Sequence, residues 1–162
     1  HIDLYYTFSI IHIMKNIILL AYLAGIIDGE GYIGIKRYHG KKCVSPTFHE
    51  RITICMSEKY ILDIFKKKFG GYIQVRNFNN HRIKTNKIGY SWEASDLKAA
   101  NILKIFLPFL RVKKEQARIA IKLRKSKESY KQISHKKMDE KVFQYRENLY
   151  KKIKDIHGNH HN

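Results

Sequence analysis

The chain has 162 residues, 44% of them hydrophobic, which suits one domain with a core of its own and argues against disorder. Its 32 Lys and Arg residues against 14 Asp and Glu residues give a net charge of +18. Such a surplus is typical of a protein with a polyanionic partner, nucleic acid first and an anionic membrane second. The only cysteines, Cys43 and Cys55, lack metal-type spacing, so a secreted disulfide scaffold and a zinc module are both poor interpretations, and two free thiols in a reducing interior are expected.

The first expected element is a helix over residues 17–27, which are apolar nearly all round and lead to Gly29 and Gly31. We interpret it as a buried helix. A run of eleven residues is too short to span a membrane. Because no small-residue cleavage site follows, we do not expect a signal peptide either.

Small residues recur every fourth position along this helix, at Ala21, Gly25 and Gly29. Such spacing leaves a shallow groove that a second helix can approach closely. The spacing alone does not decide between a helix of the same chain and a helix of a second copy.

Residues 32–38 alternate, with Ile33 and Ile35 on one side and polar residues on the other, which predicts a half-buried strand. Residues 51–54 alternate in the same way, with Ile52 and Ile54 inside. We expect an antiparallel pair with one apolar face and one polar, basic face.

A helix is expected over residues 58–69, ended by Gly70 and Gly71. Two further strands follow, residues 72–76 with Ile73 and Val75 inside and residues 90–94 with Tyr90, Trp92 and Ala94 inside. The polar, basic link 77–87 between them is interpreted as a mobile tip.

Helices are expected over residues 97–107, which end at Pro108, then over 112–123 and 142–156. The order of helices and strands predicts an α+β domain with one four-stranded antiparallel sheet.

The polar face of this sheet is a candidate nucleic-acid surface. Cations, amides and hydroxyls are the groups that base edges and phosphates require, and the face is short of carboxylates. The candidate contacts are Lys36, Tyr38, Arg51, Thr53, Gln74, Arg76, Ser91 and Glu93. Basic residues of the later helices are candidate phosphate contacts: Lys122, Arg124, Lys125 and Lys127.

Two segments carry a resemblance to a known family. Leu23-Ala24-Gly25-Ile26-Ile27-Asp28-Gly29-Glu30-Gly31 resembles the nine-residue signature of the LAGLIDADG homing endonucleases, and residues 107–117 are similar to the basic segment that enters the family's last core helix. The resemblance implies the family's αββαββα fold with a DNA-binding sheet. It divides the chain into an N-terminal extension (1–13), the endonuclease domain (14–127) and a basic C-terminal helical extension (128–162).

The resemblance also implies roles for single residues. A carboxylate at the end of a buried helix is unfavourable for stability and favourable for a divalent cation. Glu30 is accordingly expected to be catalytic and to bind Mg²⁺ together with the carbonyl of Gly29. Lys113 stands where the family's active-site lysine is expected, and Asp28 where an acid usually caps the partner helix. Met56 stands where an amide is common, with Lys59 as a possible substitute.

A single signature is typical of the members that act as homodimers, so Ala21, Gly25 and Asp28 are expected at the interface of two subunits. The expected function is an intron-encoded, site-specific, Mg²⁺-dependent double-strand DNA endonuclease with a long pseudo-palindromic target. Two alternatives remain: a maturase that binds intron RNA, and a catalytically inactive DNA-binding regulator. We expect an intracellular location, in an organelle or in bacterial or phage cytoplasm, and no membrane partner.

Overall fold

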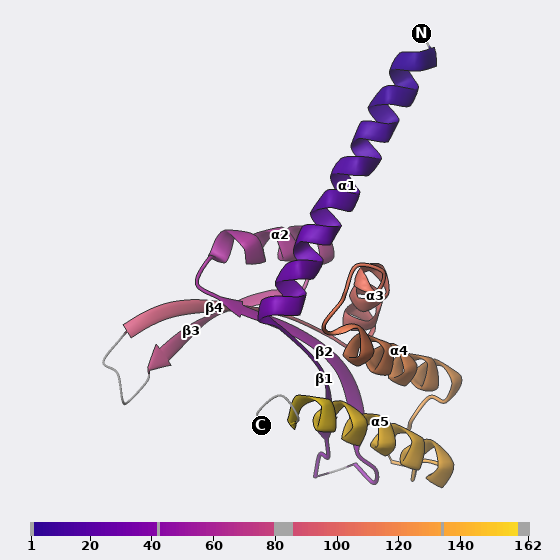
Figure 1. The fold of residues 1–162 in the computed structure, drawn as a ribbon. Helices are drawn as coiled ribbons and strands as arrows, with labels where there is room; N and C mark the ends of the chain where they lie inside the picture. Colours follow the sequence, from indigo (N-terminus) through magenta and orange to yellow (C-terminus); the bar gives the residue numbers. More distant parts are fainter. Residues whose placement is uncertain (1, 42, 80–85, 134, 159–162) are drawn as a thin grey trace.

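The computed structural model describes residues 2–41, 43–79, 86–133 and 135–158 (Figure 1). The expected α+β order is confirmed. The elements are α1 (Ile2–Glu30), β1 (Gly31–Tyr38), β2 (Thr47–Met56), α2 (Lys59–Phe69), β3 (Tyr72–Asn79), β4 (Asn86–Ser95), α3 (Asp96–Phe106), α4 (Lys114–Ser129) and α5 (Glu140–Gly158).

The four strands form one antiparallel sheet, as expected, and their order in the sheet is β1-β2-β4-β3. Its register pairs Ile33 with Ile52 and Ile54 with Trp92, so the apolar side chains share one face. The helices pack on that face. The opposite face, called the open face below, carries exposed side chains of the two outer strands: Lys36 and Tyr38 of β1, and Gln74 and Arg76 of β3.

Two clusters of buried side chains form the core. The larger one packs Ile33, Ile52, Ile54 and Trp92 of the sheet against α1, α2, α3 and α4. The smaller one packs Ile35 and Phe48 against α4 and α5. The basic C-terminal segment therefore contributes α5 to the core.

Helix α1 departs most from the sequence prediction. It has 29 residues; among residues 9–30, whose burial the structure describes, only Leu23, Ala24 and Ile27 are fully buried, whereas Ile18 is 64% exposed. Figure 1 shows α1 standing away from the other elements along most of its length. The expectation of a buried helix was therefore wrong except for one face of its last two turns, because one chain covers no more of it.

The greater length also overturns the estimate that this segment is too short to span a membrane. By length and composition, the stretch Ser9–Glu30 would suffice, with a mean hydropathy of 2.0 over its most apolar window. Its last turns nevertheless pack against the sheet and α3 as part of the larger core cluster.

Three strands are longer than expected. Strands β2 and β4 begin at Thr47 and Asn86, each four residues before the predicted start, and β3 runs on to Asn79. Val75 was expected inside but is 64% exposed, because this end of the hairpin extends beyond the covering helices. Residues 80–85 of the predicted tip lie outside the described residues.

Candidate functional site

Helix α1 ends at Glu30, whose side chain is exposed, as is Gly29 before it. Gly31 follows at a close approach of backbone to backbone: a Cβ there would lie 2.5 Å from the carbonyl oxygen of Ile27. Only glycine fits that position. A carboxylate at a helix C-terminus is disfavoured by the helix dipole, so Glu30 serves no evident purpose in stabilising the helix.

Asp28 fixes the end of α1 to the start of α4. Its Oδ2 accepts a hydrogen bond from the backbone N–H of Arg111 at 2.8 Å, and its Oδ1 accepts one from that of Lys113 at 2.9 Å. The carboxylate therefore satisfies donors just before α4 of its own chain. That it also caps the helix of a second subunit stays a prediction.

Lys113 completes this junction, because its ammonium group donates to the backbone carbonyl of Asp28. Partial burial lowers the pKa of Lys113 below its ordinary value, and the nearby charges of Asp28 and Glu30 offset this only in part. Glu30, the Gly29 carbonyl and Lys113 are thus brought to one end of α1, from segments more than 80 residues apart.

The fit of a metal ion follows from the donors present. Among the described residues, no group of three or more His, Cys, Asp or Glu side chains converges. One subunit supplies one carboxylate and one backbone carbonyl, and such oxygen donors suit Mg²⁺, which usually keeps several waters. Lys59, the expected substitute near Met56, is instead paired with Asp63 of its own helix at 2.7 Å.

The open face holds the candidate DNA contacts, but not all of them are exposed. Thr53, Ser91 and Glu93 were expected in solvent, yet they are only 8%, 1% and 9% exposed. They lie on the two central strands, where longer neighbours cover them: Arg51 pairs with Glu93, and Nε of Arg76 donates to Ser91 at 3.2 Å. The prediction of their exposure was therefore wrong, and their contact with DNA stays a prediction.

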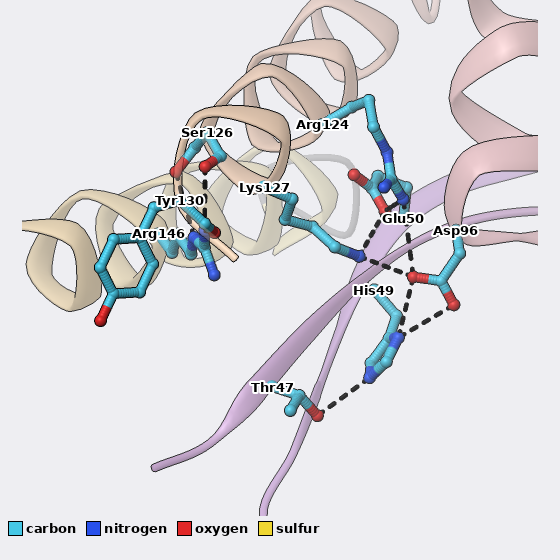
Figure 2. A network of polar contacts seen from close by, with 9 residues as sticks. All are labelled: Thr47, His49, Glu50, Asp96, Arg124, Ser126, Lys127, Tyr130 and Arg146. Carbon is cyan, nitrogen blue, oxygen red and sulfur yellow. Dashed lines mark hydrogen bonds and ion pairs between the residues drawn. The ribbon is translucent and has the colours of Figure 1, made fainter. Parts of the chain in front are cut away.

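Two basic residues of α4 also lie elsewhere than expected. Arg124 is buried and donates to the buried carboxylate of Glu50 at 2.8 Å, and Lys127 reaches the same oxygen at 3.0 Å (Figure 2). Glu50 pairs with Ile35 in the sheet register and so faces the helices. Arg124 thus neutralises a buried charge, whereas Lys122 and Lys125 remain exposed, as phosphate contacts require.

The face of α1 that carries small residues is open. Ala21, Gly25 and Gly29 are exposed, and a Cβ on either glycine would meet nothing within 4 Å. Ile18 and Tyr22 beside them are exposed as well. Of the two alternatives for this groove, a helix of the same chain is excluded for the described part of the chain.

No protein-family model and no curated protein matches this sequence. Solved structures do. The homing endonuclease I-CvuI, in complex with the I-CreI target, matches with a TM-score of 0.71 and 19% identity, over 88% of this chain and 83% of that one. The archaeal intron-encoded homing endonuclease I-Vdi141I, complexed with DNA, matches with a TM-score of 0.69 and 14% identity, over 87% and 85%.

A third match is the I-LtrWI LAGLIDADG homing endonuclease bound to target DNA, with a TM-score of 0.63 and 16% identity. It covers 81% of this chain but only 42% of that one, so this chain spans under half of its length. At these identities, what the proteins share is the fold.

Proposed function

From the LAGLIDADG homing endonuclease fold that this chain adopts, we propose that it is a site-specific, Mg²⁺-dependent endonuclease that cuts both strands of a long pseudo-palindromic DNA target. The observation that carries the proposal is the junction at the end of α1. There a structurally unnecessary carboxylate, Glu30, lies beside a partly buried ammonium group, Lys113.

Each group at the junction has a part in phosphodiester hydrolysis. Glu30 and the carbonyl of Gly29 would hold a Mg²⁺ ion, which would stabilise the attacking and leaving oxygens. Lys113 holds a positive charge next to that position and stabilises the negative charge that develops on the phosphate. Asp28 orients Lys113 through the backbone bond that it accepts.

The exposed face of α1 supports a homodimer. Glycines on this face allow two helices to approach closely, and a two-fold axis there brings two copies of Glu30 together, one for each DNA strand. The match to I-CvuI over most of both chains agrees with one domain per subunit. A two-fold protein of this kind reads a pseudo-palindrome.

The open face and the net charge of +18 support DNA as the partner. Lys36, Tyr38, Gln74 and Arg76 are exposed on the outer strands and offer donors for phosphates and base edges. Because binding of this kind releases counterions, it should weaken steeply as salt is added.

A second candidate is a catalytically inactive DNA-binding protein of the same fold. It is favoured by Met56 in place of an amide and by the pairing of Lys59 with Asp63. The test is to incubate the protein with Mg²⁺ and the intron-free form of its host gene. A double-strand cut supports the endonuclease, binding without a cut supports the inactive protein, and binding to the intron RNA alone supports a maturase.

A further inference from the structure

The open face contains a pocket of about 340 Å³ where β1, β2 and β4 meet the start of α3. Donors and carboxylates both line it: Lys36, His49, Arg51, Ser95, Glu93 and Asp96. His49 reaches this face because β2 begins at Thr47, and it lies opposite Lys36 in the register. Neither His49 nor Asp96 has a part in the junction at Glu30.

One wall of the pocket is an arginine held by a buried carboxylate. The guanidinium of Arg51 donates to Glu93, and the same carboxylate lies opposite Tyr72 in the sheet register and raises the pKa of Tyr72. Nε of Arg51 is too buried to reach a ligand, but the side chain is 32% exposed and lines the pocket. Since one terminal nitrogen is fixed by Glu93, the guanidinium is held in place and still offers N–H groups to a ligand.

The opposite wall is His49, which is held by Asp96 at the start of α3. Nδ1 of His49 lies 3.0 Å from each carboxylate oxygen of Asp96, and its Nε2 lies 2.9 Å from the hydroxyl of Thr47. Asp96 also accepts from Lys127 at 2.6 Å, and Lys127 in turn reaches the buried Glu50 (Figure 2). A chain of charges therefore runs from the core of the protein to the pocket.

Two further observations concern Asp96. Burial alone would raise its pKa, but the hydrogen bonds from Lys127 and His49 outweigh this and hold the pKa below its usual range. Its φ of 54° is the only positive value at a non-glycine position among the described residues. A positive φ is uncommon for a residue with a Cβ and is adopted mainly by asparagine and aspartate, so it marks this position without placing it under strain.

The chemistry of the walls selects among the four bases. The carboxylates of Glu93 and Asp96 are already engaged by donors of the protein, so the groups left for a ligand are the donors of Lys36 and Arg51. In the major groove, guanine presents two adjacent acceptors, N7 and O6, and arginine or lysine is their commonest partner. Adenine and cytosine would instead require an acceptor from the pocket.

We propose that this pocket recognises one guanine base in each half of the target, with Arg51 and Lys36 as donors, and that Asp96 is the positioning residue that fixes His49 as its far wall. This inference rests on the proposed DNA-binding function and adds the identity of one base. It also gives a role to the charged Asp96, with its positive φ, at the first position of α3.

The test is selection of bound sequences from a pool of random duplex DNA, without divalent metal so that no strand is cut. The wild type should enrich guanine at one position in each half-site. Arg51→Gln should lower this preference by about tenfold or more and favour adenine, since glutamine pairs with adenine. Asp96→Asn should weaken the preference at the same position only, because asparagine tolerates a positive φ and the fold is retained.

Asp63→Asn is the matched control, because it makes the same change in an exposed ion pair of α2. If the wild type enriches no sequence, the proposed DNA-binding function is overturned. This result comes from the wild type alone, so it is distinguishable from a failure of the inference. If the wild type does select a sequence, the inference is overturned when Arg51→Gln changes no base preference. It is also overturned when Asp96→Asn selects the same bases as Asp63→Asn.

Discussion

Asp28 and Lys113 bond to each other reciprocally: the carboxylate of Asp28 accepts the backbone N–H of Lys113, and the ammonium group of Lys113 donates to the backbone carbonyl of Asp28. Two residues that are far apart in the sequence thereby fix the end of α1 against the start of α4. Glu30, two residues after Asp28, and Lys113 are consequently held in one place, and the proposed chemistry depends on this junction.

The lowered pKa of Lys113 predicts a pH dependence. A lysine with a depressed pKa loses its proton at a lower pH than an exposed lysine, so cleavage that needs the ammonium group should decline as the pH rises through that pKa. Lys113→Arg should move this decline to higher pH, because arginine stays protonated. The measurement is the single-turnover cleavage rate as a function of pH.

Lys114→Arg provides the control for that experiment. It makes the same change at the neighbouring position, the first residue of α4, and should leave the alkaline decline where the wild type has it. An identical decline in the wild type and in an active Lys113→Arg would mean that another group titrates.

Glu50→Gln tests the buried charge network. The carboxylate is fully buried and is paired with Arg124 and Lys127, and removing one partner of such a network costs about 3–5 kcal/mol. Asp63→Asn breaks an exposed i,i+4 pair and should cost only about 0.3–0.5 kcal/mol. Urea unfolding of both variants measures the difference, and equal losses would show that the network contributes no more than a surface pair.

Gly25→Leu tests the proposed dimer interface. Within one subunit a side chain at this position meets open space. Leucine also has a higher helix propensity than glycine, so the free energy of unfolding of the subunit should not fall. Between two closely packed helices, leucine has no room, so light scattering should report a monomer. Asp155→Leu, at an exposed position of α5, is the control and should leave the mass unchanged. A dimeric Gly25→Leu would place the interface elsewhere.

The alternation of apolar residues was sufficient to predict the sheet, because a strand with one buried face repeats every second residue. The helices were predictable from a different period, because the buried face of a helix repeats about every 3.6 residues. The pattern could not show that α1 is mostly exposed, because an apolar helix looks the same whether its own chain or a partner covers it. Nor did it show that Thr53 and Ser91 are buried, because their burial depends on the side chains of neighbouring strands.

The proximity of Glu30 and Lys113 could be predicted because motifs marked both residues, whereas contacts that depend on the tertiary structure could not; the catalytic roles of the two residues stay predictions. His49 was missed because Glu50, a charged residue at an inward-facing position, interrupts the apolar alternation and made β2 appear to begin at Arg51. Arg124 and Lys127 appeared to be surface cations because the sequence does not show that Glu50 faces them. The one available signal was Glu50 itself, a charged residue at an apolar position of a strand, which requires a buried cation as its partner.

The most direct test of the central claim is to measure cleavage and binding of target DNA by Glu30→Gln beside the wild type. The amide keeps the size of the side chain and removes the charge that a divalent cation requires, so cutting should be abolished while binding in the absence of metal stays within about twofold. Glu128→Gln, an exposed position of α4, should cut like the wild type. Cleavage by Glu30→Gln at the wild-type rate would contradict the account.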